Sequence, residues 1–249
     1  MEVYGFSTGR VRPKSRERGV RRYLPGGWST ETLPVNVFAV THPEGTLLFD
    51  AGQTALAARG GYFTPWHPFL RLARFELGPE DEAAPQLRRL GLDQADVRWL
   101  VLSHLHTDHV GGVGTFRHAE VLVSAVEWRR ATGFGGRIRG YLPQHWPDGL
   151  VPRLVELGGP AVGPFSGSFD VAGDCRLLLV GTPGHTAGHV ALLVRADDAA
   201  YLLAGDLVHS AAELDALAPE IASYCRVESV VVLAAHDPDA LSRVAAARS

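Results

Sequence analysis

The sequence predicts one α/β domain in which two layers of strands have helices on their outer sides. Apolar runs of strand length recur along the 249 residues and alternate with segments of helical pattern. Hydrophobic residues make up 46% of the chain and charged residues 20%, as in an ordinary globular protein. No tandem repeat or low-complexity linker divides the chain. We therefore interpret residues 1–249 as a single domain, with residues 1–30 as an N-terminal arm and loop.

The elements are expected in the following order. Residues 35–40 and 46–49 are apolar strands, and the turn between them indicates a hairpin. A helix is expected over 80–90, since acidic residues begin it, arginines lie in its last turn and Gly91 follows. Further strands are predicted at 97–102, 121–123, 176–180, 190–195, 200–203 and 230–234, and further helices at 125–131 and 238–248.

Bulk properties exclude several classes of protein. No apolar run approaches the roughly 18 residues that a membrane helix needs, and the first residues lack the layout of a signal peptide. Cys175 and Cys225 give no disulfide framework and are interpreted as buried thiols in a reducing cytoplasm. The net charge of −3 gives no general attraction to nucleic acid. We predict a cytoplasmic protein that binds neither membranes nor nucleic acid.

One local feature departs from this balance, a basic run near the N-terminus. It comprises Arg10, Arg12, Lys14, Arg16, Arg18, Arg21 and Arg22. Such a run is typical of a solvated arm. The alternatives are a subunit contact, and hence a homodimer, or a nucleic-acid contact.

The most informative stretch is Ser103–Gly112, which follows the predicted strand 97–102. It places His104, His106, Asp108 and His109 within six residues. On an extended turn, residues two apart point the same way, so His104 and His106 can bind one ion while the other two side chains face a second. Neutral imidazole and carboxylate groups suit zinc, iron, cobalt or manganese.

Three later residues share this placement after an apolar strand. His185 follows residues 177–180, Asp206 follows 201–203, and His236 follows 230–234. Each alone is typical of a turn residue. Because ligands in α/β proteins gather where strands end, the shared placement favours one site to which all three contribute.

The pattern His104-x-His106-x-Asp108-His109, with His185, Asp206 and His236, resembles the signature of the metallo-β-lactamase superfamily over roughly residues 35–236. The resemblance implies an αββα sandwich of two mixed sheets, with two divalent metal ions, zinc first among them, at the edges of the sheets. By the same resemblance the first ion is held by His104, His106 and His185, the second by Asp108, His109 and His236, and both by Asp206.

Within the superfamily the chain most resembles the N-acyl homoserine lactonases, the quorum-quenching branch, through Ser103–Gly112, Thr182–His189 and His236–Asp237. Asp206 stands where the commonest class of zinc β-lactamases carries cysteine, which disfavours antibiotic hydrolysis. One position departs from the branch: His209 stands where a tyrosine is typical.

The resemblance implies a mechanism for opening a lactone ring. A hydroxide held between the two metal ions attacks the lactone carbonyl. Asp108 then carries a proton to the leaving alkoxide, and His209 donates a hydrogen bond to the carbonyl in place of the tyrosine. The alternative for His209 is that it faces away or only packs.

An acyl chain would need an apolar groove, and loop aromatics are candidates for its lining. We predict Trp28, Trp66, Phe69, Phe134 and Tyr141 as substrate contacts, with core or dimer packing as the alternative. Two other functions stay open: another ester, thioester or phosphotriester hydrolase with the same site, and a metal-stabilised binding protein without turnover.

Overall fold

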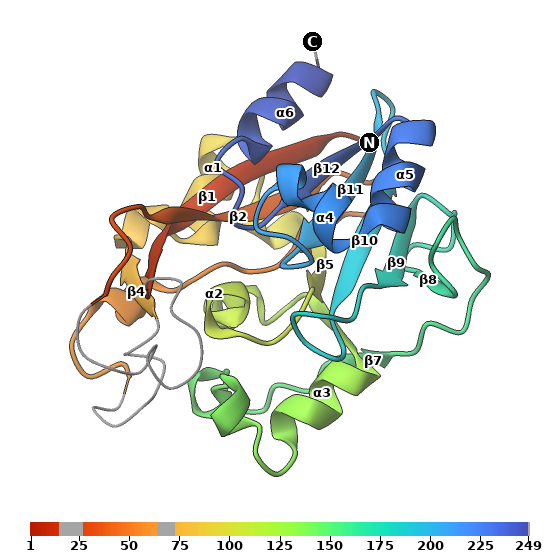
Figure 1. Ribbon diagram of the computed structural model, residues 1–249. Coiled ribbons are helices and arrows are strands. Elements are labelled where there is room, and N and C mark those ends of the chain that lie inside the picture. The colour runs from red at the N-terminus through yellow and green to blue at the C-terminus, as the bar shows by residue number, and fades with distance from the viewer. Residues whose placement is uncertain (15–26, 64–72, 249) are drawn as a thin grey trace.

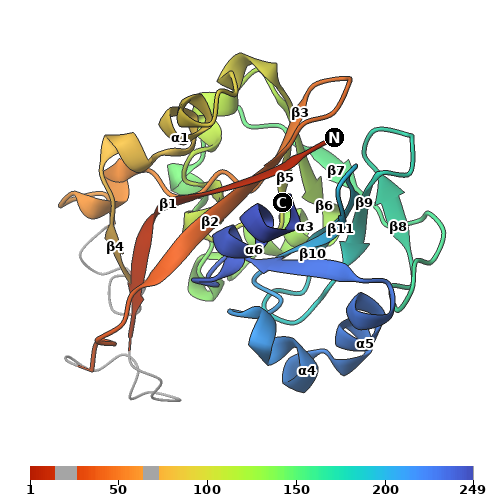
Figure 2. The ribbon, with the colours of Figure 1, turned by 90° about the horizontal axis from the view of Figure 1, so that it is seen from above.

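Two mixed β-sheets packed face to face form the centre of the computed structural model, with helices outside them (Figure 1). The structure describes residues 1–14, 27–63 and 73–248. Figure 2 shows α1 (Ala83–Arg89) on one side of the sheets and α4 (Leu214–Leu217) with α5 (Pro219–Val227) on the other. The αββα sandwich implied by the resemblance is confirmed.

The first sheet has seven strands in the order β4-β1-β2-β3-β5-β6-β7. Their bounds are β1 Val3–Pro13, β2 Leu33–Val40, β3 Thr46–Phe49, β4 Ala73–Glu76, β5 Val97–Leu102, β6 Glu120–Ser124 and β7 Arg153–Val155. β2 and β3 pair antiparallel, which confirms the predicted hairpin. From β3 to β7 the pairing is parallel, so the carboxyl ends of these strands meet at one edge.

The second sheet has five strands in the order β12-β11-β10-β9-β8. Their bounds are β8 Ser168–Asp170, β9 Leu177–Gly181, β10 Val190–Arg195, β11 Ala200–Gly205 and β12 Val230–Ala234. Only β11 and β12 pair parallel. The backbone joins the two sheets near the site, because the N–H of Val190 donates to the Ser103 carbonyl and that of Asn36 to the Ala235 carbonyl.

Apolar layers lie between the sheets and under the helices. Phe38, Phe49 and Leu192 belong to the inner layer and are at most 1% exposed. Leu87 of α1 packs on the outer face of the first sheet, and Cys225 of α5 on the outer face of the second. Strands covered on both faces read as continuous apolar runs, which is why the sequence shows the central strands so clearly.

The remaining helices are short. They are α2 Thr107–Val110, α3 Ala125–Thr132 and α6 Ala240–Ala247, with 3₁₀ turns at Ala55–Ala58, Pro79–Asp81, Gln94–Asp96, Val113–Phe116, Arg137–Arg139, Pro143–His145 and Ala211–Glu213. No helix among the described residues is long and apolar enough to cross a membrane.

The predicted N-terminal arm is wrong for its first residues. Val3–Pro13 forms β1, which pairs with both β2 and β4. Polar and glycine residues interrupt its apolar pattern, and this concealed the strand. Arg10 and Arg12 project from β1, where Arg12 pairs with Glu76 of β4 at 2.8 Å. The basic residues from Arg16 to Arg22 lie outside the described residues.

The interpretation of both cysteines as buried is correct for Cys225 and wrong for Cys175. Cys175 lies in the turn before β9 with a positive φ of 62° and is exposed. Cys175 lies in a turn, where the sequence has no apolar periodicity that would indicate whether a side chain is buried or exposed. α4, α5 and the short edge strands β4, β7 and β8 were also not predicted.

Candidate metal centre

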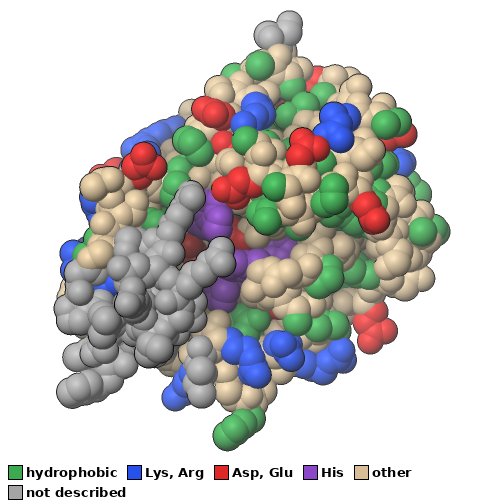
Figure 3. Space-filling view, in the orientation of Figure 1, with side chains coloured by type: hydrophobic (Ala, Val, Ile, Leu, Met, Phe, Trp, Pro, Cys, Tyr) green, Lys and Arg blue, Asp and Glu red, His purple; other side chains and the backbone are tan. Residues whose placement is uncertain are grey.

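The histidines of the signature meet in a hollow at the ends of the strands. His104, His185, Asp206 and His236 lie on the segments that follow β5, β9, β11 and β12. Figure 3 shows histidine side chains, in purple, gathered in this hollow. The structure brings all seven residues predicted as ligands together: His104, His106, Asp108, His109, His185, Asp206 and His236.

The first group consists of His104, His106 and His185. Nδ1 of His106 lies 3.0 Å from Nε2 of His104 and 2.9 Å from Nε2 of His185. Nε2 of His106 lies 3.1 Å from the Arg139 carbonyl oxygen and must donate to it, since a carbonyl only accepts. Burial, together with the neighbouring His185, lowers the pKa of His106 to about 4. His106 is therefore neutral, and its Nδ1 presents a lone pair to the group.

The second group consists of Asp108, His109 and His236. The extended turn predicted for this stretch gives way at Thr107 to the helical turn α2, which carries Asp108 and His109. Nδ1 of His109 donates to Asp50 and Nδ1 of His236 to the Pro34 carbonyl, both at 2.8 Å. These bonds fix the rings from behind, as is usual for histidines that bind metals.

Asp206 lies between the two groups. Its Oδ2 is 3.4 Å from Nε2 of His185, on the side of the first group. Its Oδ1 is 3.3 Å from Nε2 of His109 and 3.4 Å from Nε2 of His236, on the side of the second group. Burial alone would raise the pKa of Asp206, but His236 and His109 hold it well below its usual range. The residue is thus a carboxylate with one oxygen toward each group.

The donor set fits divalent cations. Asp206 Oδ1 and His109 Nε2 are buried, and neither has a hydrogen-bond partner among the described residues. Leaving such atoms unpaired costs about 1–3 kcal/mol each. Burial opposes a charge on His236, yet Asp206 raises its pKa to about 9. A cation between these groups would take the place of that proton and pair the unpaired atoms, and imidazole with carboxylate is the donor set of zinc and its neighbours.

Two residues that the sequence analysis gave no role hold the ligands in place. Asp50, at the end of β3, accepts hydrogen bonds from the Ser103 N–H at 2.7 Å, from Ser103 Oγ at 2.8 Å and from His109. Nε2 of His189 accepts from the backbone N–H of Asp206 at 3.0 Å. Gly205, at a φ of +52°, allows this close approach, because a Cβ there would lie 2.8 Å from His189 Nε2. Asp50 follows β3 directly, the same placement after a strand that singled out His185, Asp206 and His236.

The aromatic residues predicted as substrate contacts differ in their burial and surroundings. Tyr141 is 2% exposed and its ring lies 5.4 Å from that of His106, so it supports His106 from inside and does not line an open groove. Phe134 is fully exposed. Trp28 is half-buried, with the Arg74 guanidinium 4.2 Å from its ring centroid. Trp66 and Phe69 lie outside the described residues.

His209 lies beside the second group. Its ring centroid is 6.0 Å from that of His236, and its side chain is 58% exposed. The backbone N–H of His209 donates to Glu213 Oε2 at 3.2 Å. The imidazole is therefore at the solvent side of the second group.

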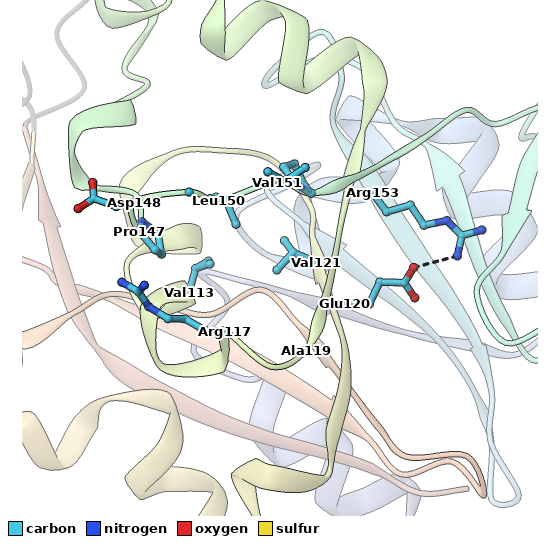
Figure 4. Close-up of a pocket in the computed structure, with 12 residues that line it drawn as sticks. Val113, Arg117, Ala119, Glu120, Val121, Pro147, Asp148, Leu150, Val151 and Arg153 are labelled. Carbon is cyan, nitrogen blue, oxygen red and sulfur yellow. Dashed lines mark hydrogen bonds and ion pairs between the residues drawn. The ribbon is translucent and has the colours of Figure 1, made fainter.

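A separate hollow of about 600 Å³ lies away from this site (Figure 4). Residues from 113–121 and 147–153 line it, and an ion pair between Glu120 and Arg153 lies at its rim. It contains none of the seven predicted ligands.

The protein belongs to the metallo-β-lactamase superfamily, whose family model matches residues 30–242. It is 30% identical over 241 residues to the N-acyl homoserine lactonase AttM of Rhizobium radiobacter, with 86% of each chain covered. Its fold is similar to that of an N-acyl homoserine lactone hydrolase solved with N-hexanoyl-L-homoserine bound at the catalytic metal centre (TM-score 0.71, 22% identity, 96% of this chain and 94% of that chain covered). It is also similar in fold to AidC, a dizinc quorum-quenching lactonase (TM-score 0.59, 15% identity, 95% and 87% covered).

Proposed function

We propose that the chain is a dinuclear metal-dependent hydrolase that opens the lactone ring of N-acyl homoserine lactones. The observation that carries the proposal is the position of Asp206, whose two oxygens face two separate groups of ligand atoms. Structural zinc sites are usually closed mononuclear tetrahedra, and a carboxylate shared between two groups is typical of a two-metal catalytic site. The 30% identity to the lactonase AttM supports the choice of substrate.

In this proposal each group binds one ion, and zinc is the native metal, with iron, cobalt and manganese as metals that the same donors accept. The first ion takes His104, His106 and His185, the second takes Asp108, His109 and His236, and Asp206 serves both. When bound, two such cations supply hydroxide at neutral pH and stabilise negative charge on the reacting oxygens.

The chain's own residues complete the reaction. Asp108 is 8% exposed, and its Oδ2 lies 3.6 Å from Nε2 of His236. Its carboxylate can hold a proton and pass it to the alkoxide that leaves when the ring opens. His209, on the solvent side of the site, donates a hydrogen bond from a ring nitrogen to the lactone carbonyl. This bond orients the carbonyl and strengthens as its oxygen becomes negative.

A hydrolysis panel tests the proposal. Protein loaded with two equivalents of zinc is given N-acyl homoserine lactones from C4 to C12, a thioester and a phosphotriester. We expect lactone opening to dominate, to be lost in His185→Ala, and to persist in His118→Ala, whose imidazole bonds the Gln94 carbonyl on the surface. Faster hydrolysis of the thioester or phosphotriester would assign another reaction of the superfamily, and no turnover of any substrate would indicate a binding protein.

The homodimer and the cytoplasmic location stay predictions from the sequence. So does an apolar groove for the acyl chain, for which Trp66 and Phe69 remain candidates. Each methylene buried in such a groove is worth about 0.8 kcal/mol at most. A rise in kcat/KM from C4 to C10 lactones would support the groove, and equal values would refute it.

A further inference from the structure

A buried carboxylate lies behind the first group of ligands. Glu127 is the third residue of α3 and its side chain is 0% exposed. It forms no ion pair with any arginine, lysine or histidine among the described residues. Burying a carboxylate without a counter-ion is unfavourable unless hydrogen bonds replace its water. The hydrogen-bond donors to Glu127 therefore show which segments this carboxylate holds in place.

The donors come from the two loops that carry the first group. Oε1 of Glu127 accepts from the backbone N–H of Leu105, the residue between His104 and His106, at 3.1 Å. Oε2 accepts from Thr186 Oγ1 at 2.8 Å and from the N–H of Gly188 at 3.2 Å. Thr186 directly follows His185. One carboxylate thus joins the loop after β5 to the loop after β9.

Two further contacts lie around this junction. Burial and the nearby Glu127 carboxylate raise the pKa of the Tyr141 phenol, and the Tyr141 ring lies beside that of His106 at an interplanar angle of 34°. Gly188 packs directly on the start of α3, where an added Cβ would lie 2.2 Å from the Glu127 nitrogen. The loop after β9, the start of α3 and the ring behind His106 therefore all pack around the carboxylate.

We propose that Glu127 is a positioning residue that sets the geometry and the metal affinity of the group His104, His106 and His185. The second group has other supports, because His109 is held by Asp50 and His236 by the Pro34 carbonyl. Loss of the Glu127 carboxylate should therefore weaken the binding of one of the two metal ions and leave the binding of the other unchanged. The inference rests on the proposed function only in taking these three histidines as metal ligands.

Cobalt titration of metal-free protein tests this selectivity. The variant is Glu127→Gln, which keeps the size of the side chain but turns an amide NH₂ toward at least one of the donors. Its matched control is Glu82→Gln, since Glu82 also accepts from a hydroxyl and a backbone N–H, those of Thr54 and Ala55, away from the site. Affinities come from competition with a chelator, and the cobalt absorption bands report the ligand geometry.

We expect Glu127→Gln to bind one equivalent 10- to 100-fold more weakly, as supporting residues behind metal ligands typically show, with altered absorption bands for that equivalent. The other equivalent stays within threefold of wild type, and Glu82→Gln matches wild type in both. Wild-type affinities and bands in folded Glu127→Gln would overturn the proposal, and so would equal weakening of both equivalents.

Two further variants keep the proposal testable if Glu127→Gln does not fold. Thr186→Val removes one donor and keeps the carboxylate, and Tyr141→Phe removes the hydroxyl that lies near it. Each should weaken the same equivalent by about 3- to 10-fold. Unchanged affinity in both would overturn the proposal. A wild-type protein that binds two equivalents but hydrolyses no lactone would refute the proposed function and leave this measurement valid.

Discussion

Replacing Asp50 by Asn isolates the contribution of one carboxylate to the second group of ligands. The substitution keeps the shape, and asparagine tolerates the positive φ of 65° at this position. The Asp50 carboxylate accepts three hydrogen bonds, with Oδ1 facing the Ser103 N–H and Oδ2 facing both Ser103 Oγ and Nδ1 of His109. An amide has only one acceptor oxygen, so either orientation leaves at least one donor opposed to the NH₂ group.

Both orientations have a definite cost. If the amide oxygen faces His109, the buried Ser103 N–H loses its acceptor, which costs about 1–3 kcal/mol. If the NH₂ group faces His109, that ring must accept at Nδ1 and carry its proton on Nε2, the atom 3.3 Å from Asp206 Oδ1. A proton on Nε2 blocks binding of a metal ion there.

Urea denaturation and metal competition measure the two costs. We expect metal-free Asp50→Asn to lose about 1–3 kcal/mol of unfolding free energy. We also expect one metal equivalent to bind about 10- to 100-fold more weakly. The control is Asp93→Asn, an exposed residue that caps a 3₁₀ turn through the N–H of Ala95. If Asp50→Asn keeps both its stability and its metal affinities, Asp50 does not fix the tautomer of His109.

Three further predictions concern the site. Asp206→Ala should bind fewer than two metal equivalents by elemental analysis and lose hydrolysis, because two cations lose their shared anion; a fully active variant with two equivalents would contradict this. His209→Ala should lower kcat/KM about 5- to 150-fold, the value of one hydrogen bond of about 1–3 kcal/mol, with unchanged metal content and partial recovery in His209→Tyr; wild-type kcat/KM would make His209 a packing residue. Metal-free protein should be most stable to urea near pH 6.5. The His236 pKa is raised to about 9, so the stability that its proton gives is lost as pH rises from 6.5 to 9. The His106 pKa is lowered to about 4, so as pH falls from 6.5 to 4 the unfolded chain is protonated before the folded chain, and stability is lost on this side too. Urea unfolding midpoints that change in only one direction between pH 4 and pH 9 would refute the prediction.

The sequence by itself determined the central strands and predicted the residues that meet at the candidate site. His104, His106, Asp108 and His109 stand close together in the chain, and the strand before them is buried on both faces, so that local pattern and final environment agree. His185, Asp206 and His236 were singled out as candidates because each follows an apolar strand. β1 was missed, since its polar residues conceal the alternation of a strand that is covered only in part along its length.

Only the tertiary structure decided which oxygen of Asp206 faces which group and which residues support the two groups. The two oxygens of Asp206 face different groups because β11 delivers it between the loops that follow β5 and β12. Asp50 and Glu127 act through hydrogen bonds to residues 53 and 59 positions away in the chain. Tyr141 was predicted as a substrate contact on a loop. It is instead buried beside His106, because the loop that carries it folds inward against that residue. Such roles depend on distances between segments far apart in sequence, and no local pattern records them.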